Sequence, residues 1–131
     1  MSRARLRGIG VDAVKISRMD VTRMGMHVIK RMFHNQEVAQ LQTMEQGQSE
    51  FLASRFAAKE ALVKALGTGF KGISPSEIAV VVDDLGKPEF LLTSEFRHRF
   101  NVEKATFHLS LTHDGDLAIA FVVVEDIDGS C

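Results

Sequence analysis

Residues 51–69, FLASRFAAKEALVKALGTG, decide how this chain folds. They predict a long helix that is apolar on nearly every side, yet the helix carries four charged side chains: Arg55, Lys59, Glu60 and Lys64. A helix that is hydrophobic all round is usually buried. Burying a charge is costly unless a partner neutralises it. These four groups therefore need partners, and the chemistry of the partners should indicate the function.

The helical spacing places two of these charges beside small residues. At about 100° per residue, Ala53, Ala57, Glu60 and Lys64 share one narrow sector of the helix. The two alanines leave a depression where another group can approach the charged pair. The alternative is an ordinary i,i+4 ion pair on a solvated surface, worth roughly 0.2–0.5 kcal/mol. The apolar surroundings weigh against it, because a solvated pair needs a polar face.

The composition is that of one globular domain. The 131 residues are 45% hydrophobic and 25% charged, which fits a single domain over residues 1–131. No apolar run approaches the roughly 20 residues that cross a bilayer, and the basic N-terminus lacks the apolar segment of a secretory signal. The only cysteine is Cys131, so a disulfide within the chain is excluded. We therefore expect a cytoplasmic protein with no membrane contact.

The charges are unevenly distributed along the chain. The net charge is −1, but residues 1–34 carry eight Lys or Arg side chains against Asp12 and Asp20, a local charge of +6. A basic region on a nearly neutral protein suits an acidic partner better than nucleic acid. The simpler alternative is that these charges only solvate a helix surface.

The first segment of the chain predicts a strand with an unusual face. Residues 7–14, RGIGVDAV, alternate so that Gly8, Gly10 and Asp12 share one side. Glycine and aspartate are poor strand residues, so we expect this face to let another group come close to the backbone.

The remaining segments predict an α+β fold with a mostly antiparallel sheet packed on the long helix and shorter helices. Helical patterns cover residues 17–31, interrupted at Gly25, and residues 35–46, while the long helix begins at Ser49 and ends at Gly67. Two strands, EIAVVVD and PEFLLT, precede a short helix over residues 94–100. The final strands, ATFHLSLTH and LAIAFVVVE, join through Asp114-Gly115, a strong hairpin signal. The predicted order is β-α-α-α-β-β-α-β-β.

Asp12 and Glu60 are the candidate metal ligands. Two carboxylates are too few for a calcium site, but they suit Mg²⁺, which completes its coordination with water and substrate phosphate. The alternative is that Asp12 only accepts hydrogen bonds from Arg18 or Lys15.

Two further motifs give weaker signals. GTGFKG, residues 67–72, matches the dinucleotide fingerprint G-x-G-x-x-G, but it ends a helix instead of opening one, so we reject that reading. HLSLTH places His108, Ser110 and Thr112 on one strand face. A zinc site would need further ligands. Phosphodiesterases that use His-x-Ser carry two copies, and a second copy is absent here.

Four segments occur together in one order: GIGVDAVKISR, FLASRFAAKEALVKALGTG, GKP and HLSLTH. In that order and spacing, roughly residues 7–125 resemble the holo-[acyl-carrier-protein] synthase family of 4′-phosphopantetheinyl transferases. The resemblance implies an Mg²⁺-dependent enzyme of fatty acid biosynthesis. Such an enzyme transfers the 4′-phosphopantetheine arm of coenzyme A to a serine of apo acyl carrier protein and releases 3′,5′-ADP. It also implies a homotrimer with active sites between subunits.

The resemblance assigns roles to particular residues. Asp12 and Glu60 match the metal carboxylates, and Lys64 matches a lysine near the pyrophosphate. His108 matches a histidine near the coenzyme A phosphates. The positions that match the coenzyme A groove are Arg55, Gly67, Gly69 and Pro88. Arg18 matches the arginine that meets the carrier protein, and the basic face of Arg18, Arg23, Lys30 and Arg31 would attract its acidic helix.

One segment departs from the family pattern. The family usually has Phe-Thr followed by a glutamate, a capping box, where this chain has Phe33-His34-Asn35-Gln36-Glu37. We therefore expect the helix cap to move to Asn35.

The chemistry agrees with the implied roles. Pyrophosphate cleavage leaves negative charge on both fragments, which a magnesium ion and an ammonium group would stabilise. We expect Asp12 and Glu60 to hold Mg²⁺, Lys64 to stabilise or protonate the departing phosphate, and a carboxylate to take the serine proton. The rival functions are a non-catalytic module that binds carrier protein and a phosphodiesterase that removes the same arm.

Overall fold

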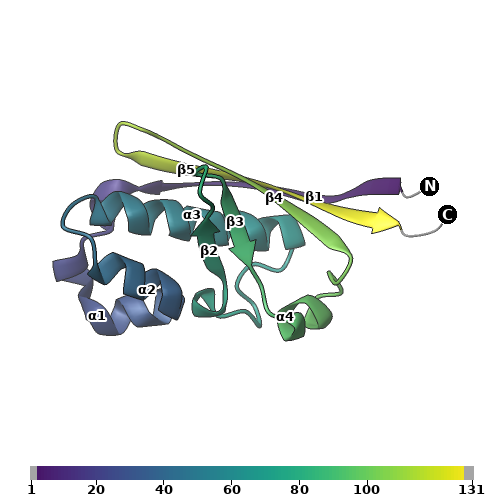
Figure 1. Cartoon of the computed structure of the whole chain (residues 1–131), viewed down its shortest axis with the longest axis horizontal. Coiled ribbons are helices and arrows are strands. Elements are labelled where there is room, and N and C mark those ends of the chain that lie inside the picture. The colour runs from purple at the N-terminus through teal and green to yellow at the C-terminus, as the bar shows by residue number, and fades with distance from the viewer. Residues whose placement is uncertain (1–2, 129–131) are drawn as a thin grey trace.

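A computed structural model describes residues 3–128, and its elements follow the predicted order (Figure 1). Cys131 lies outside the described residues. The strands are β1 (Arg3–Lys15), β2 (Ala79–Val82), β3 (Pro88–Leu91), β4 (Ala105–Asp114) and β5 (Leu117–Asp128). The helices are α1 (Val21–Met32), α2 (Asn35–Gln42), α3 (Gln48–Leu66) and α4 (Ser94–Arg99), with 3-10 turns η1 (Ile16–Arg18) and η2 (Pro75–Glu77). The predicted α+β class is confirmed.

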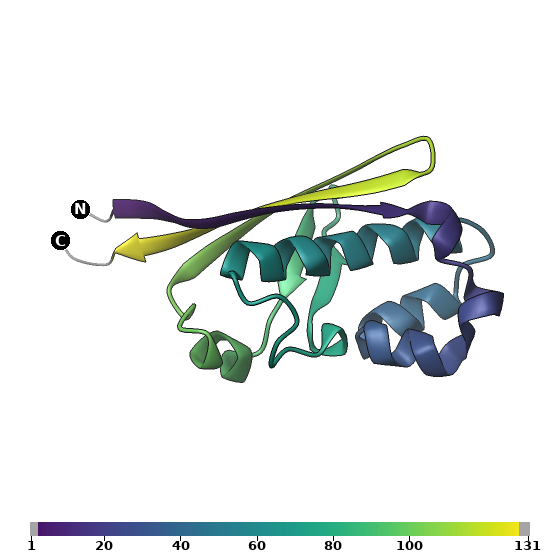
Figure 2. The ribbon, with the colours of Figure 1, turned by 180° about the vertical axis from the view of Figure 1, so that it is seen from behind.

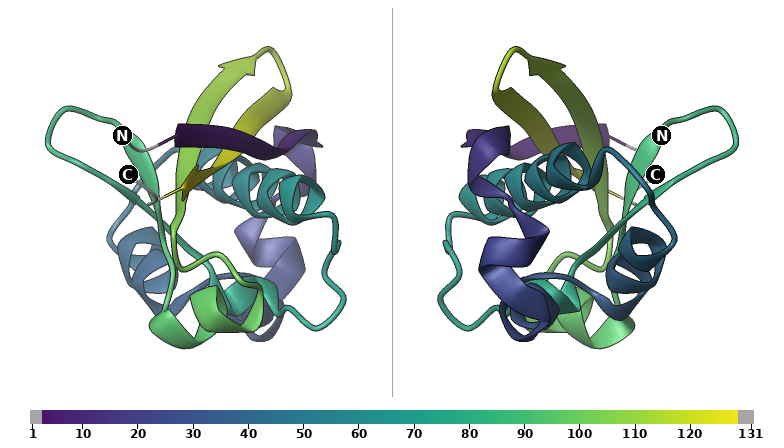
Figure 3. Two further views of the ribbon diagram at one scale, coloured as in Figure 1. Left: turned by 90° about the vertical axis from the view of Figure 1, so that its right-hand side faces the viewer. Right: turned by 90° about the vertical axis from the view of Figure 1, so that its left-hand side faces the viewer.

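Two antiparallel sheets make up the β structure of residues 3–128. The larger has the order β1-β5-β4 and forms a layer over one side of α3, while the other helices lie on the opposite side of α3 (Figures 1 and 2). The smaller sheet pairs β2 with β3, and its hairpin projects to the side of the molecule (Figure 3). The long helix therefore lies between a sheet and a layer of helices.

The glycines of β1 let the sheet contact the backbone of α3. A Cβ atom on Gly8 would lie 1.9 Å from the carbonyl oxygen of Ala65, and one on Gly10 would lie 1.9 Å from that of Ala61. Only glycine fits at such distances. The expectation of a close backbone approach is confirmed, and the approaching group is α3. Asp12, two residues further along the same face, is thereby held against the helix.

The core surrounds α3 on both sides, as its apolar sequence predicts. Toward the sheet, Ala61 and Leu62 pack in a cluster that includes Ala120 and Val122 of β5. Toward the helices, Leu52 packs in a second cluster built from these residues: Ile29, Phe33, Val38, Leu41 and Phe51. Removing this much apolar surface from water is the main stabilising contribution to the fold.

The N-terminus of α2 differs from the expectation. We expected Asn35 as the cap, but His34 occupies that position, and its Nδ1 atom accepts from the Gln36 backbone nitrogen at 3.0 Å. Glu37 Oε1 accepts in return from the His34 backbone nitrogen at 2.9 Å. The capping box is therefore retained, because an imidazole nitrogen can accept the bond that a hydroxyl oxygen usually accepts. The helix also ends at Gln42, earlier than predicted.

The first helix begins later than predicted. We expected it from Ser17, but residues 16–18 form the turn η1 and α1 begins at Val21, because Asp20 caps it by accepting from the backbone nitrogens of Thr22 and Arg23.

The remaining helix boundaries agree closely with the sequence. Gly25 interrupts α1 with φ 79°, and Gly67 ends α3 in the left-handed region with φ 77°. The long helix begins at Gln48, one residue before the expected Ser49. Thr93 caps α4, accepting from the Phe96 backbone nitrogen at 3.0 Å.

One face of the large sheet is apolar and exposed. Leu6, Ile9 and Val11 of β1 and Phe121 of β5 are between 45% and 67% exposed. Ile9, Val11 and Phe121 point away from α3, because they alternate with the residues that contact it. The register shift between Leu6 and Gly8 brings Leu6 to the same face. We call this surface the outer sheet face. Within residues 3–128, no helix is both long and apolar enough to cross a bilayer.

Candidate active site

Asp12, Glu60 and Lys64 come together where β1 crosses α3. Lys64 Nζ donates to Asp12 Oδ1 at 2.9 Å and to the carbonyl oxygen of Val11 at 3.1 Å. Asp12 is thus paired with Lys64, and neither Arg18 nor Lys15 is its partner. The reading of Lys64 as half of a simple surface pair with Glu60 is also wrong. We call Asp12, Glu60 and Lys64 the β1–α3 cluster.

Burial and the neighbouring Asp12 carboxylate disfavour the ionised form of Glu60. Burial, followed by hydrogen bonding and repulsion from Asp12, raises the pKa of Glu60 to about 7 against the opposing effect of Lys64. Asp12 Oδ2 is buried and, while Glu60 is ionised, has no hydrogen-bond donor among the described residues. An unsatisfied carboxylate oxygen beside a second crowded carboxyl is the donor set that a small divalent cation would satisfy.

The cluster supplies two carboxylates and no further protein ligand. Across residues 3–128, no group of three or more His, Cys, Asp or Glu side chains is arranged to hold a metal ion. Magnesium commonly binds one or two carboxylates and fills its remaining positions with water and phosphate oxygens. The cluster therefore fits magnesium.

Lys59 has a different role from its neighbours in the sequence. Its ammonium group is fully buried and lies 2.5 Å from Glu37 Oε1. It also donates to three backbone carbonyl oxygens, those of Met32 at 3.2 Å, Pro75 at 2.9 Å and Ile78 at 2.7 Å. Lys59 thus joins the ends of α1 and η2 to α3, while Glu37 Oε2 accepts from the Val80 backbone nitrogen at 3.0 Å. Glu37 is not recognisable from the sequence as this partner, because it lies 22 residues from Lys59 along the chain.

Arg55 lies apart from the cluster. Its guanidinium group stacks 4.3 Å from the centre of the Phe51 ring, and Nη1 donates to Ser54 Oγ at 3.1 Å. Burial lowers the pKa of Arg55, and its Nε atom is buried with no acceptor among the described residues. It lines a cavity of about 150 Å³ with Thr112 and His113 of β4. An arginine in this state is suited to bind an anionic group.

Pro88 and His108 line a separate pocket of about 540 Å³ between β3 and β4. His108 Nε2 lies 2.6 Å from Glu125 Oε1. His108 is paired across the sheet with Val123, which is paired with Ile9, so His108 belongs to the outer sheet face. Asp12 lies on the opposite face. Within one chain, the sheet therefore separates His108 from the β1–α3 cluster.

The remaining predicted residues lie at the two ends of α3. Gly67 and Gly69 form the turn that follows the helix. Arg18 is exposed on η1. The Arg23 side chain, by contrast, is partly used within the fold, because its Nη2 atom donates to the carbonyl oxygen of Ser17 at 3.1 Å.

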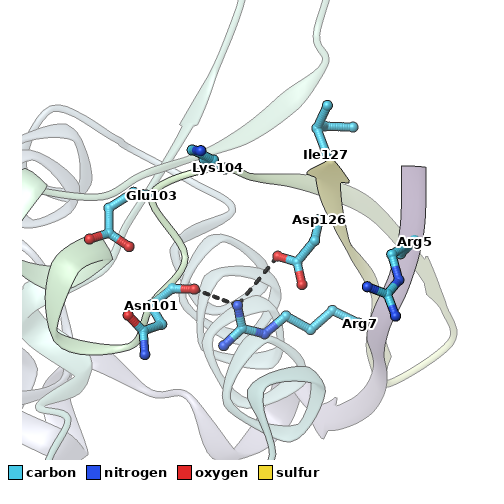
Figure 4. A pocket seen from close by; sticks show the side chains of 7 residues that line it. All are labelled: Arg5, Arg7, Asn101, Glu103, Lys104, Asp126 and Ile127. Atoms are coloured by element: carbon cyan, nitrogen blue, oxygen red, sulfur yellow. Dashed lines mark hydrogen bonds and ion pairs between the residues drawn. The ribbon is translucent and has the colours of Figure 1, made fainter. Parts of the chain in front are cut away.

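A charged pocket near the start of β1 contains none of the predicted residues (Figure 4). Its central side chain, Arg7, donates to the carbonyl oxygens of Asn101 at 2.5 Å and Phe100 at 2.9 Å and pairs with Asp126 at 3.3 Å. These bonds hold the loop after α4 against the sheet. We therefore assign Arg7 a structural role.

Comparison with known proteins gives a consistent result. A family model described as the 4′-phosphopantetheinyl transferase superfamily matches residues 8–122. The holo-[acyl-carrier-protein] synthase of Trichlorobacter lovleyi is 44% identical over 122 residues, covering 90% of this chain and 96% of that protein. The enzyme of the same name from Alkalilimnicola ehrlichii is 42% identical over 125 residues, covering 92% and 98%.

Solved structures agree with the sequence comparison. The holo-[acyl-carrier-protein] synthase of Neisseria meningitidis superposes with a TM-score of 0.84 at 32% identity, covering 93% of this chain and 100% of that one. A synthase from Bacillus anthracis in complex with CoA (3′,5′-ADP) gives 0.77 at 33% identity, covering 92% and 97%. The Helicobacter pylori synthase in complex with coenzyme A gives 0.76 at 32% identity, covering 88% and 98%.

Proposed function

The chain belongs to the 4′-phosphopantetheinyl transferase superfamily, and from this premise we propose that it acts as a transferase between coenzyme A and acyl carrier protein. It transfers the 4′-phosphopantetheine arm of coenzyme A to a serine of apo acyl carrier protein, giving holo acyl carrier protein and 3′,5′-ADP. The observation that carries the proposal is the β1–α3 cluster, two crowded carboxyls beside a lysine, in a chain whose relatives are named for this reaction.

Asp12 and Glu60 would hold a magnesium ion. The supporting observations are the unpartnered Oδ2 atom of Asp12 and the raised pKa of Glu60, both of which a bound cation would relieve. When bound, Mg²⁺ neutralises charge on the pyrophosphate of coenzyme A.

Lys64 provides the positive charge of the site. Its side chain is 54% exposed, and Asp12, which raises the pKa of Lys64, keeps it protonated. The serine oxygen forms a bond to the phosphorus that carries pantetheine, and the bond from that phosphorus to the bridging oxygen breaks. Lys64 then stabilises or protonates the departing phosphate of 3′,5′-ADP, and a carboxylate of the cluster takes the serine proton.

The phosphates of coenzyme A would be bound by residues outside the β1–α3 cluster. Arg55, with its buried and unpartnered Nε atom, is suited to an anionic group of coenzyme A. Gly67, Gly69, Pro88 and His108 would line the coenzyme A groove.

Residues 1–131 would form one domain, and the protein would act in the cytoplasm.

The active form is proposed to be a homotrimer. Single exposed apolar residues are normal, but a contiguous apolar surface such as the outer sheet face marks an interaction site. His108 lies on that face, across the sheet from the β1–α3 cluster of its own chain. Packing copies through this face would allow His108 and Pro88 of one copy to complete the site of another.

Val11→Glu tests the assembly. Val11 is 56% exposed in the single chain, so glutamate there should leave the fold intact but place a charge in the apolar contact. Sedimentation velocity should show a trimer for the unaltered protein and mainly monomer for the variant, with reduced turnover. Gln40→Glu, an equal charge change on exposed α2, should remain trimeric. A fully trimeric Val11→Glu variant would contradict an interface through this face.

Carrier-protein docking is assigned to Arg18 and the nearby basic residues. The basic residues are Arg18, Arg23, Lys30 and Arg31, and they would attract an acidic helix of the carrier protein in a salt-dependent manner. Arg18→Glu should raise the KM for carrier protein by about tenfold or more, because juxtaposed like charges cost several kcal/mol.

Steady-state kinetics with each substrate varied in turn would measure that effect. The KM for coenzyme A should change little. Lys104→Glu, which makes the same charge change in the pocket near the start of β1, should leave both values near those of the unaltered protein. Equal increases in both KM values for Arg18→Glu would mean that the docking assignment is wrong.

The reaction is tested by measuring the mass of the carrier protein. The protein is mixed with coenzyme A, Mg²⁺ and an apo carrier protein, and the carrier is analysed by intact-mass spectrometry. A gain of one phosphopantetheine group is expected. Loss of that group from holo carrier would indicate a phosphodiesterase. Tight binding with no mass change would indicate a non-catalytic binding module.

A further inference from the structure

The short turn that carries Arg18 is held by a residue from the far end of the sequence. Asp116 lies in the turn between β4 and β5, which meets η1 at one end of the molecule (Figure 1). Its Oδ1 atom accepts from the Ser17 backbone nitrogen at 2.9 Å, and its Oδ2 atom accepts from Ser17 Oγ at 2.6 Å. Its carbonyl oxygen accepts from the Ile16 backbone nitrogen at 2.8 Å. Two consecutive residues of η1 are thereby fixed to the hairpin.

These bonds provide a cap that η1 does not have locally. Lys15, at the N-cap position of η1, makes no side-chain hydrogen bond to the turn. A three-residue 3-10 turn has few internal hydrogen bonds, so its geometry depends on outside contacts. The carboxylate of Asp116 supplies the acceptor that an adjacent Ser or Asp normally supplies. Arg23 makes a further hydrogen bond to the turn, donating to the Ser17 carbonyl oxygen at 3.1 Å.

We propose that Asp116 is a positioning residue for carrier-protein docking, which acts by holding η1 so that Arg18 faces its acidic partner. The inference rests on the docking role proposed above for Arg18. Asp116 need not touch the carrier protein or coenzyme A. In this role, Asp116 connects the last hairpin to the proposed docking surface.

If Asp116 is removed, its charge and its positioning role predict opposite changes in the KM for carrier protein. Asp116 is a negative charge beside a basic surface, so its removal alone should strengthen attraction for an acidic partner. Loss of positioning should weaken docking instead, because the binding event must then order the turn and the Arg18 side chain. The direction of the change therefore decides between the two effects.

The test is Asp116→Ala, with Asp114→Ala as the matched control. Asp114 is the last residue of β4, beside the same turn, and within residues 3–128 no hydrogen bond joins its side chain to η1. Both variants remove one negative charge from the same hairpin. Asp116→Ala should raise the KM for carrier protein about two- to tenfold, while kcat and the KM for coenzyme A stay unchanged. Asp114→Ala should leave the KM for carrier protein unchanged or lower it.

A double variant shows whether Asp116 acts through Arg18. If it does, adding Asp116→Ala to Arg18→Glu should raise the KM for carrier protein no further, because the guanidinium group is already gone. Ser17→Ala, which removes only one of the three bonds, should change the KM in the same direction by a smaller amount. Amide hydrogen exchange at Ser17 should be faster in Asp116→Ala than in the unaltered protein.

The outcomes separate this inference from the docking proposal. If Arg18→Glu leaves the KM for carrier protein unchanged, the docking role of Arg18 and the positioning role of Asp116 are both overturned. If Arg18→Glu raises it but Asp116→Ala lowers it or matches Asp114→Ala, only the role of Asp116 is overturned. Equal increases in both KM values for Asp116→Ala would also overturn it, because a general loss of structure would then explain the effect.

Discussion

Replacing Glu60 with glutamine is expected to lower turnover by about 100-fold or more while leaving the fold intact. The variant keeps the size and shape of the side chain but removes one of the two carboxylates that would hold Mg²⁺. Loss of one preorganised electrostatic contact in an active site typically costs about 100- to 1,000-fold in rate. Steady-state assays of phosphopantetheine transfer, at saturating coenzyme A and carrier protein, would measure this effect.

The stability of the Glu60→Gln variant should not fall with its activity. The folded state raises the pKa of Glu60 to about 7, above its ordinary value of 4.5, so the ionised form is disfavoured by folding. That unfavourable contribution grows as pH rises from about 4.5 to about 7 and is fully present above pH 7. Neutral glutamine removes it, so without Mg²⁺ the variant should be at least as stable as the unaltered protein at pH 8.

Metal binding gives a readout that does not depend on turnover. Mg²⁺ should raise the Tm of the unaltered protein, because it binds only the folded state, and should raise that of Glu60→Gln much less. Glu50→Gln, at the start of the same helix, should keep both activity and the Mg²⁺ response. Near-normal rates for Glu60→Gln would remove Glu60 from the metal site.

Replacing Lys59 with methionine is expected to lower the free energy of unfolding by about 3–5 kcal/mol. Removing one partner of a buried ion pair has a large effect because it leaves an uncompensated charge in the core. Here Glu37 would lose its ammonium partner, and the carbonyl oxygens of Met32, Pro75 and Ile78 would lose a donor. Urea unfolding followed by circular dichroism would measure the change.

Lys64→Met is the matched control for this prediction. Lys64 lies five residues further along α3, but its side chain is 54% exposed, so water can replace part of its pairing with Asp12. The free energy of unfolding should therefore fall by less than in Lys59→Met. The substitution should nevertheless abolish most of the activity, because Lys64 belongs to the β1–α3 cluster. Adding Glu37→Gln to Lys59→Met should recover part of the lost stability by removing the unpaired charge. A Lys59→Met variant as stable as the unaltered protein would contradict a structural role for this pair.

The sequence of the long helix predicted that its charged side chains have partners, but not which of them are buried. An apolar helix with four charges predicted that these charges have partners, and Lys59 and Lys64 both have them. The sequence did not distinguish the two lysines, since FAAKEALVK gives each an apolar setting. Burial separates them, and burial depends on which side of α3 the sheet covers. That side is set by Gly8 and Gly10, whose closeness to Ala65 and Ala61 becomes visible only in three dimensions.

Glu37 was missed for an identifiable reason. The spacing of His34 and Glu37 is that of a capping box, but histidine is an uncommon cap, so the sequence favoured Asn35 instead. A correct cap would have placed Glu37 in the first turn with its carboxylate directed back at the chain. Its second partner, Lys59, lies 22 residues away in the sequence, a contact that no local pattern predicts.

The position of His108 also required the structure. Strand alternation correctly grouped His108 with Ser110 and Thr112 on one face, but alternation does not say which face meets the core. The pairing of β4 with β5 and of β5 with β1 decides it, placing His108 with Ile9 and opposite Asp12. The separation of these two residues within one chain is what makes an assembly of several copies part of the proposed function.

The most direct test of the account is the position of a divalent ion relative to Asp12 and Glu60. Crystals of the full chain grown with coenzyme A and Mn²⁺, a common substitute for Mg²⁺, would give an anomalous difference map. If Asp12 and Glu60 hold the metal together, the map should show one strong peak per active site, in contact with carboxylate oxygens of both residues. A peak that contacts only one of them, or that lies away from both, would contradict it.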